Sequence, residues 1–468
     1  MRDLCAELKA NRVRYCHWKS NAFLDRSRSA ENDLDLLIAR ADADRFAAVL
    51  HGLGFKLAHR RWGALPGVLD YYGHDAATER LVHVHAHYQL IVGDDRTKGY
   101  RIPLERAFLD AARPDGEFLV PPPELELLLL VIRLTLKHAT WEGLLTGLSS
   151  PSRSARGELA FLRERADMER VHDWLERELP WLDRGAFSAS LEALAPEGGR
   201  LQLVRSGRRL VRELESCARR PRRADLGLRL WRRAAGLGRR LLRRRAPAKQ
   251  LSGGGALIAI IGADGAGKST LVDALCDWLG GTFRVVPAHL GRPPASRTTF
   301  LLKNLARARG AARRLARRRT PRATEQAVLA TALARDRYLA YRRIRRIAVN
   351  GDLVVCDRFP LPQLSTMDAP RVERVRNPER WARLTRRLLA LERRYYDAIA
   401  APDVAIVLRV DPEVAVARKP EEDPDFVRAR WRDIWETDWA TVPAHVVDAS
   451  RPQEEVLAAV RSVVWSEI

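Results

Sequence analysis

Residues 262–271 read Gly-Ala-Asp-Gly-Ala-Gly-Lys-Ser-Thr-Leu, and they decide the fold of the second half of this chain. They fit the phosphate-binding pattern G-x-x-x-x-G-K-[S/T]. The apolar run 256–261 in front of them predicts a buried strand, and the residues behind them predict a helix. Because a strand, a glycine-rich loop and a helix form the context that the pattern requires, the sequence predicts a nucleotide phosphate site.

The residue types of this loop suit that chemistry. Glycines let the backbone N–H groups turn inward around a polyphosphate at a helix N-terminus. Lys268 can reach the β- and γ-phosphates, and the Ser269 hydroxyl is placed to bind Mg²⁺. The alternative is a glycine-rich turn without such a role. The expected nucleotide-binding residues are Gly262, Asp264, Gly265, Gly267, Lys268, Ser269 and Thr270.

The composition is that of a globular, strongly basic protein. The chain has 468 residues, 46% of them hydrophobic and 30% charged, with a formal net charge of +23. At about 150 residues per domain, two or three domains are expected. Such a charge favours an anionic partner. Only nine of the 82 basic residues are Lys, however, and this Arg bias is typical of a GC-rich genome, so the charge is weak evidence.

The cysteines and the hydropathy indicate a cytoplasmic protein that is soluble or peripheral to a membrane. The five cysteines are scattered, no C-x-x-C pair occurs, and the first residues do not resemble a signal peptide. No apolar run approaches the ~20 residues that cross a bilayer. We therefore expect a chain in a reducing compartment with no transmembrane segment.

Four segments are expected along the chain, and its overall class is α/β. Short apolar runs alternating with helical stretches predict a small α/β or α+β domain over 1–115. Helical periodicity at 125–145 and 161–179 predicts an all-α appendage over 116–200. An Arg-rich connector follows at 201–252, and the phosphate-loop domain covers 253–468.

Two arginine runs, 239–245 and 313–319, could contact nucleic acid or an acidic membrane face. Aromatic residues that would stack on single-stranded bases are almost absent from both runs. A solvated helix or linker is therefore the favoured interpretation, and nucleic acid is not an expected partner.

A second motif follows the loop. The apolar strand expected at 352–356 ends in Asp357-Arg358-Phe359. A carboxylate at the C-terminal end of a neighbouring parallel strand can hold Mg²⁺ through water, so Asp357 is a predicted metal-binding and catalytic residue. The alternative is a charged strand end that only faces solvent.

Together these motifs resemble the thymidylate kinase family of nucleoside monophosphate kinases. The resemblance covers about 256–468 and rests on the loop 262–271, Asp357-Arg358-Phe359, the strand 401–408, Asp411-Pro412 and Arg418. It implies a P-loop fold with a parallel five-stranded sheet and a closing lid. ATP and Mg²⁺ are the implied cofactors.

The resemblance also implies roles for single residues. Asp264 corresponds to the carboxylate that positions the acceptor nucleotide, and Arg358 to the residue that grips the acceptor phosphate. Arg292 stands in the segment that faces the acceptor. The loop positions where some members carry a catalytic arginine are Gly265 and Ala266 here, so the lid must supply that charge. The candidates are Arg418, Arg428 and Arg430, with Arg418 assigned as catalytic.

The acceptor is not predicted. Pro360-Leu361-Pro362 stands where the family has a Ser, and the segment that reads the thymine base has no convincing match. A nucleotide, a sugar or a polysaccharide intermediate each stays open as the small phosphate-bearing acceptor.

The N-terminal half carries a second acidic pattern. Asp33 and Asp35 stand at i and i+2 at the start of an apolar strand, so both lie on one face and can share a divalent cation. This arrangement is typical of nucleotidyltransferases. A strand whose acidic start faces water is the alternative.

This half resembles an uncharacterised nucleotidyltransferase-like family over about 1–120, in the Lys19-Ser20-Asn21 turn, the Asp33-x-Asp35 strand and the strand ending at His87. Ser20 replaces the expected glycine, and His85 stands where a third carboxylate is expected. An active enzyme and a degenerate binding domain both stay open. The alternating His83, His85 and His87 could hold a metal, although hydrogen-bonded strand histidines are favoured.

The expected function is therefore an ATP-dependent phosphotransferase fused to a nucleotidyltransferase-like domain. Two alternatives stay open: a nucleotide-binding regulatory or assembly protein without productive transfer, and a nucleotidyltransferase in polysaccharide or antibiotic-type small-molecule metabolism. The expected partners are ATP and the small acceptor, with a homodimer left open as the assembly.

Overall fold

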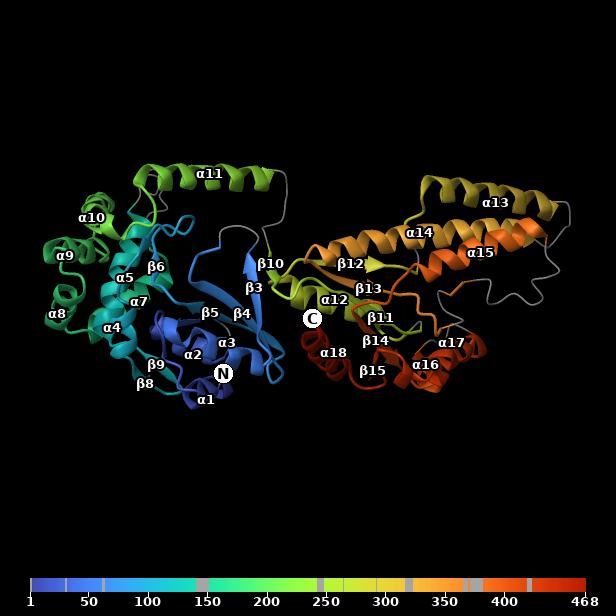
Figure 1. Ribbon diagram of the computed structural model, residues 1–468, viewed down its shortest axis with the longest axis horizontal. Coiled ribbons are helices and arrows are strands. Elements are labelled where there is room, and N and C mark those ends of the chain that lie inside the picture. Colours follow the sequence, from blue (N-terminus) through green and yellow to red (C-terminus); the bar gives the residue numbers. More distant parts are fainter. Residues whose placement is uncertain are drawn as a thin grey trace. The chain divides into compact units, whose positions relative to one another are not determined.

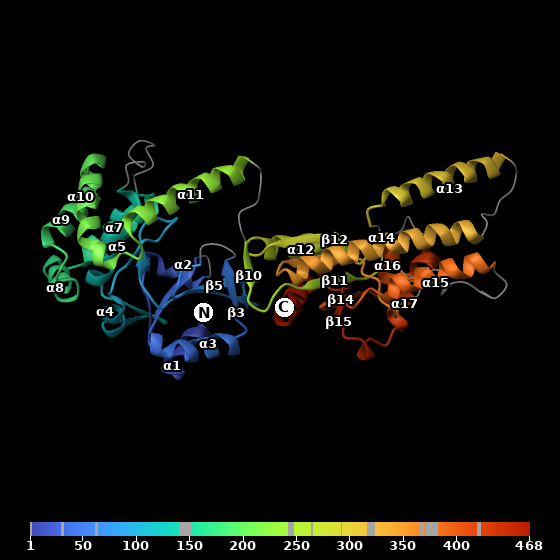
Figure 2. The same ribbon diagram turned by 45° about the horizontal axis from the view of Figure 1, so that its top comes forward.

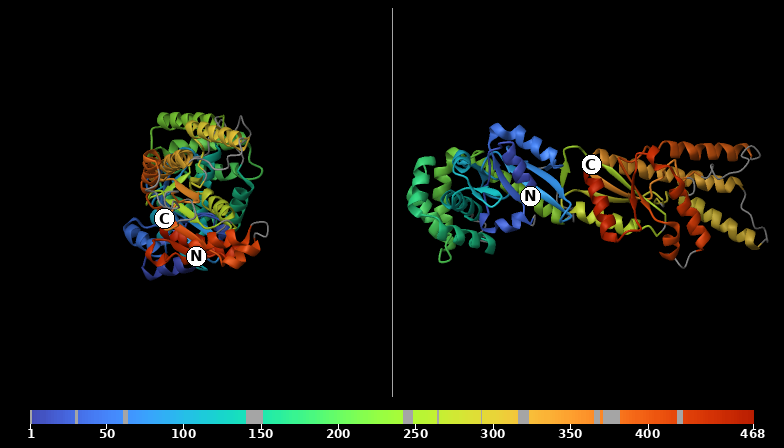
Figure 3. Two further views of the ribbon diagram at one scale, coloured as in Figure 1. Left: turned by 90° about the vertical axis from the view of Figure 1, so that its right-hand side faces the viewer. Right: turned by 90° about the horizontal axis from the view of Figure 1, so that it is seen from below.

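The computed structural model describes residues 2–29, 32–60, 64–139, 151–241, 248–263, 265–291, 293–315, 323–364, 369–370, 382–418 and 423–468. The chain divides into two compact units, residues 1–75 with 80–247 and residues 76–79 with 248–468. Each unit has its own helix-covered β-sheet, as Figures 1 and 3 show from different sides.

The N-terminal unit is built on a mixed sheet. Its strands are β1 (Tyr15–His17), β2 (Leu34–Ile38), β3 (Lys56–Arg60), β4 (Val68–Asp75) and β5 (Arg80–His87). They lie in the order β1-β2-β5-β4-β3. β2 and β5 are parallel, whereas the β1–β2, β4–β5 and β3–β4 pairs are antiparallel. The sequence missed β4, and this strand brings an acidic residue to the site described below.

Strand alternation divides the hydrophobic residues of this sheet between two cores. Leu34, Leu36 and Ile38 of β2 join a core with α1 (Arg2–Ala10) and α3 (Ala43–Gly52). Leu37 points the other way, into a core filled by α5 (Pro123–His138). Because side chains two apart share a face, Asp35 lies on the α5 side of the sheet.

The helices around α5 differ in detail from the expected appendage. Residues 161–179 do not form one helix, because Ala166 is extended and the Asp167 side chain caps a new helix. α10, inside the segment expected to be a connector, packs on α5 and α9. The remaining helices of this unit are α2 (Leu24–Arg28), α4 (Glu105–Asp110), α7 (Arg153–Arg165), α8 (Met168–Glu178), α9 (Arg184–Ala193), α10 (Arg200–Glu213) and α11 (Arg222–Leu241).

Small elements complete the unit. Two hairpins pair β6 (Ile91–Val92) with β7 (Tyr100–Arg101) and β8 (Arg113–Asp115) with β9 (Phe118–Val120). The 3-10 turns are η1 (Asn21–Phe23), η2 (Arg40–Asp42) and η3 (Leu214–Cys217).

The C-terminal unit has the five-stranded parallel sheet that the family resemblance implied. Its strands are β11 (Leu257–Ile261), β12 (Val285–His289), β13 (Leu353–Asp357), β14 (Val404–Arg409) and β15 (His445–Asp448), in the order β12-β13-β11-β14-β15. All neighbouring pairs are parallel. The fully buried, β-branched β11 forms the centre of the sheet, which is typical of strands covered on both faces.

Along the chain, helices connect the successive strands of the parallel sheet. α14 and α15 run side by side, with α13 alongside α14 (Figure 2). Within the described residues, no helix combines the length and apolar character needed to cross a membrane. The remaining elements are β10 (Lys249–Leu251), α12 (Lys268–Gly280), α13 (Arg297–Leu315), α14 (Ala323–Val349), α15 (Arg383–Asp397), α16 (Pro412–Arg418), α17 (Pro424–Glu436), η6 (Trp439–Thr441) and α18 (Gln453–Glu467).

Candidate functional site

The glycine-rich loop connects β11 to α12. Gly265 and Gly267 have φ angles of 90° and 81°, in the left-handed region that favours glycine. At Gly262 a Cβ would lie 3.1 Å from the Ala266 Cβ and 3.2 Å from the Leu408 Cβ. Backbone conformation or close packing therefore favours glycine at each of these three positions. The loop ends at the N-terminus of α12, as an anion-binding site requires.

The hydroxyl and ammonium groups of the loop begin α12. Lys268 is its first residue, is buried, and donates from Nζ to the Ala263 carbonyl at 2.8 Å. Ser269 and Thr270 follow in the first turn and are exposed. The Lys268 side chain thus folds back over the loop, where the sequence predicts that a polyphosphate binds. Asp264 lies outside the described residues.

Asp357 and Arg358 lie next to the strand that leads into the loop. Asp357 pairs in register with Ile260, and the Arg358 N–H donates to the Ile260 carbonyl at 3.2 Å. The Oδ1 atom of Asp357 is buried and has no hydrogen-bond partner among the described residues. His289 on β12 comes to 3.9 Å from its Oδ2. Sequence spacing correctly placed this carboxylate at the C-terminal edge of the sheet.

Arg358 adopts a left-handed backbone conformation with φ 56°, which is unusual for a residue with a side chain. A Cβ on Gly291 would come within 2.5 Å of the Arg358 Cδ, so Gly291 leaves the space that this side chain fills. Arg292, the next residue, lies outside the described residues.

Arg337 on α14 is a site residue that sequence reasoning missed. It is buried and donates to the Leu290 carbonyl at 2.7 Å and to the Gly291 carbonyl at 3.0 Å. It also bonds the Tyr396 hydroxyl. Arg337 therefore fixes the turn after β12 against which Arg358 packs. In a chain with 82 basic residues, no sequence signal separates this arginine from surface ones.

A cavity of about 260 Å³ lies beside the loop. One wall comes from the loop and the first turns of α12, and the other from the connection between β15 and α18. A base or sugar attached to a polyphosphate in the loop would face this space. Its lining residues are Gly265, Ala266, Gly267, Thr270, Leu271, Ala274, Leu408, Ala449, Arg451, Gln453, Val456 and Leu457.

The candidate lid comprises α16 and α17. Arg428 forms a two-pronged ion pair with Glu413, at 2.8 Å and 3.0 Å, and a further bond to Asp425 at 3.3 Å. These carboxylates raise the pKa of Arg428 and hold its guanidinium on the lid surface. The side chains of Arg418 and Arg430 lie outside the described residues.

The N-terminal unit gathers a second polar cluster on its sheet. Asp35, His85 and Asp70 stand in one row across β2, β5 and β4. His85 Nδ1 lies 3.0 Å from Asp35 Oδ1, and His83 bonds both Asp33 and Asp70 at 2.8 Å. Asp33 and Asp35 therefore have different histidine neighbours.

Asp70 is a carboxylate of this cluster that the sequence pattern did not reveal. The third acidic position was expected to hold His85 alone, but β4 brings Asp70 level with it. Asp70 is buried and Arg60 approaches its Oδ2 at 3.8 Å. No local pattern marked this residue, because its strand was not predicted.

Carboxylates on α5 and α7 bind the backbone of the Lys19-Ser20-Asn21 turn. Ser20 has φ 61°, which explains why a glycine would suit this position. The Ser20 N–H donates to Glu158 at 3.0 Å, and the Asn21 N–H donates to Glu126 at 3.2 Å. Two donors that a triphosphate would need are thus bonded to buried carboxylates.

Burial and charge act in opposite directions on this cluster. Burial raises the pKa of Asp35, but Lys19, with Nζ 2.8 Å from Oδ1, and the two histidines more than offset it, so the pKa lies well below its ordinary value. Burial lowers the pKa of His87 to about 3. Asp35 is ionised and His87 neutral at neutral pH, which is the state in which both groups can act as ligands.

No protein-family model matches the chain. The uncharacterized ATP-binding protein YghR of Escherichia coli is 29% identical over 225 residues, which cover 44% of this chain and 86% of the E. coli protein. The match is the same for strain K12 and strain CFT073.

Two thymidylate kinases are among the solved structures that resemble it. The enzyme from Ehrlichia chaffeensis shares 19% identity with a TM-score of 0.27, covering 45% of this chain and 99% of its own. That from Candida albicans shares 17% with a TM-score of 0.30, covering 45% and 91%. The sheet order and the loop described above carry the assignment. The C-terminal unit has a P-loop kinase fold.

Proposed function

We propose that the C-terminal unit is an ATP-dependent phosphotransferase that acts on a small phosphate-bearing acceptor. The observation that carries this proposal is the position of Asp357-Arg358. They end the strand next to the one that enters the glycine-rich loop, with the Arg358 N–H bonded to Ile260. The loop proposed to bind the donor and the arginine proposed to hold the acceptor phosphate would thus share one sheet edge. The E. coli relative, described as ATP-binding, supports ATP as the donor.

The residues present fit ATP and Mg²⁺. Left-handed Gly265 and Gly267 and the helix N-terminus suit a polyphosphate. Mg²⁺ would supply charge neutralisation between phosphates. Ser269 and Asp357 would hold it, and the buried Oδ1 of Asp357, which has no hydrogen-bond partner among the described residues, suits this role.

The protein groups would act by position and charge. Lys268 would move from the Ala263 carbonyl to the phosphates, and Arg358 would hold the acceptor phosphate with its planar fork. Arg337 would keep the Leu290–Gly291 turn in place behind it. A lid arginine would meet the developing charge, and Arg418 stays the prediction for it, since Arg428 is paired with Glu413.

The test is an acceptor panel. The full-length protein is incubated with labelled ATP, Mg²⁺, and nucleoside monophosphates, sugar phosphates and sugars. Transfer that Lys268→Ala abolishes and Lys303→Ala on α13 leaves unchanged would support the proposal. Tight ATP binding without transfer to any acceptor would instead favour the regulatory or assembly role.

The nucleotidyltransferase-like activity of the N-terminal unit stays a prediction. Asp70 supplies a third carboxylate on the same face, which favours it. The Ser20 and Asn21 N–H groups are engaged by Glu158 and Glu126, which opposes triphosphate binding by this turn.

A further inference from the structure

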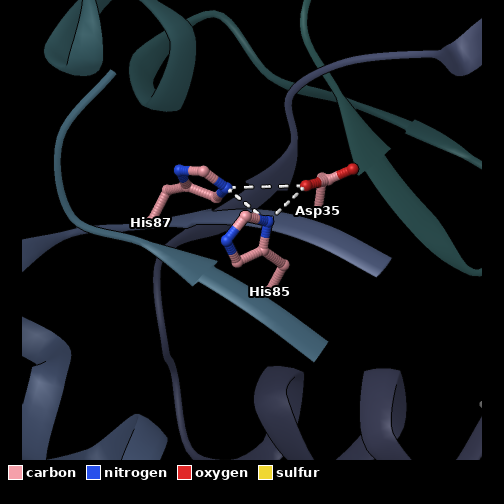
Figure 4. A group of neighbouring side chains, drawn as sticks. All are labelled: Asp35, His85 and His87. Atoms are coloured by element: carbon pink, nitrogen blue, oxygen red, sulfur yellow. Dashed lines mark hydrogen bonds and ion pairs between the residues drawn. The ribbon is translucent and has the colours of Figure 1, made fainter. Parts of the chain in front are cut away.

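Three side chains of the N-terminal sheet converge on one point. Asp35 comes from β2, and His85 and His87 come from β5, where alternation puts both histidines on the same face. Figure 4 shows the carboxylate and the two imidazole rings pointing toward one another. The three facing atoms are Asp35 Oδ1, His85 Nδ1 and His87 Nε2.

The distances among these atoms suit a metal ion. They are 3.0 Å from Asp35 to His85, 3.2 Å between the histidines and 3.5 Å from Asp35 to His87. Zinc binds imidazole nitrogen and carboxylate oxygen at about 2.0–2.1 Å, so two ligands of a tetrahedral ion lie about 3.3–3.4 Å apart. The three distances between the side-chain atoms are therefore close to the ligand–ligand distances of a tetrahedral zinc site.

Hydrogen bonds alone satisfy this arrangement poorly. A proton on His85 Nδ1 can be shared between Asp35 Oδ1 and His87 Nε2, but the 3.5 Å contact between Asp35 and His87 then joins two lone pairs. A second proton on His87 Nε2 would instead set two N–H groups 3.2 Å apart. His87 is only 4% exposed, so solvent does not relieve either arrangement. A cation between the three atoms removes this conflict, because each atom then offers a lone pair.

We propose that Asp35, His85 and His87 bind one divalent transition-metal ion of the zinc type. Two imidazoles with one carboxylate favour such an ion over Mg²⁺, which prefers oxygen ligands. Three protein ligands leave the fourth position of a tetrahedral ion for water or for an anionic ligand. All three residues belong to the N-terminal unit, so this proposal does not rest on the proposed phosphotransferase.

The surroundings support this assignment. The second nitrogen of His85 lies 3.8 Å from Asp70 Oδ1, and Asp70 also accepts from His83 at 2.8 Å. A carboxylate behind a ligating histidine is the usual outer partner of a metal site, and Asp70 lies on that side of His85, at a distance longer than a hydrogen bond. Lys19, with Nζ 2.8 Å from Asp35 Oδ1, is the cation that a metal must displace.

The test uses the full chain, purified without a polyhistidine tag and stripped with a chelator. Co²⁺ is titrated and followed by visible absorption, which reports the ligand geometry, and Zn²⁺ is then added as competitor. We expect one Co²⁺ per chain in a four- or five-coordinate site, displaced by Zn²⁺ but not by excess Mg²⁺. Displacement by Mg²⁺, or no bound Co²⁺, would overturn the assignment.

Matched variants separate the triad from its neighbours. Asp35→Asn and His85→Ala should weaken binding beyond the roughly 10- to 100-fold that loss of an outer partner costs. His51→Ala, at an exposed histidine, should leave binding unchanged, and His83→Ala should cost no more than an outer partner does. Lys19→Met should bind more tightly, a gain that misfolding cannot produce. Weaker binding by Lys19→Met, or equal losses for His83→Ala and His85→Ala, would contradict the triad.

Discussion

Arg358 combines a strained backbone with a predicted role in holding the acceptor phosphate. Its φ of 56° lies in the left-handed region, and its side chain packs against Gly291. A residue with a Cβ costs about 1–2 kcal/mol in that region, whereas glycine does not. We therefore expect stability and activity to respond in opposite directions when Arg358 is replaced by glycine.

The magnitude follows from comparing two substitutions that both remove the guanidinium. Arg358→Ala keeps the left-handed cost, and Arg358→Gly removes it but adds about 0.4–1 kcal/mol of unfolded-state entropy. The glycine variant should thus be more stable than the alanine variant by roughly 0.5–1 kcal/mol. For a unit of this size that is about 1–4 °C in Tm.

Thermal unfolding of the two variants measures this difference directly. In the activity assay both should lose about 1.5–3 kcal/mol of binding to the acceptor phosphate, or roughly 10- to 150-fold in kcat/KM, with ATP affinity unchanged. Arg358→Lys should recover only part of this, because an ammonium lacks the planar fork. An alanine variant as stable as the glycine variant would refute the strain argument, and unchanged kcat/KM would refute the acceptor role.

Three further substitutions test other contacts. Gly262→Ala should lower the unfolding free energy by about 1–3 kcal/mol and weaken ATP binding, because its Cβ would crowd the loop and β14. Gly253→Ala, with nothing within 4 Å, is its control. Gly207→Ala in α10 should destabilise the N-terminal unit by a similar amount, because the new Cβ would lie 2.1 Å from the Cβ of Ala139, which follows α5. Its control is Gly236→Ala in the exposed helix α11, which should be neutral or stabilising. Burial raises the pKa of Glu126 to about 7. The folded chain therefore holds a proton that the unfolded chain loses above about pH 4.5, and stability should fall as pH rises from there to about 7. Glu126→Gln should remove most of this fall in urea midpoints.

The phosphate loop and its strand could be predicted because their signals are local. A glycine-rich loop after a β-branched run has few other interpretations. The same holds for β13, whose apolar residues end in Asp357. The parallel five-stranded sheet was expected because these motifs resemble the thymidylate kinase family, and the strand order confirms it.

The residues that the sequence missed depend on contacts between distant segments. β4 contains Gly73, which normally weakens a strand, but the Phe55 ring packs where a Cβ would stand, 2.8 Å away. Because β4 was not predicted, Asp70 was not identified as a residue of the cluster. Arg337 is buried where the turn at Leu290 and the Tyr396 hydroxyl meet α14. Nothing in the local sequence reports such a contact, so tertiary structure had to supply it.

ATP labelled at either the γ- or the α-phosphate distinguishes phosphoryl transfer by the C-terminal unit from nucleotidyl transfer by the N-terminal unit. We expect only the γ-label to reach a small acceptor, with the transfer abolished in Lys268→Ala and intact in Asp35→Asn. Transfer of the α-label, lost in Asp35→Asn and kept in Lys268→Ala, would contradict this expectation, because the reaction would then belong to the N-terminal unit.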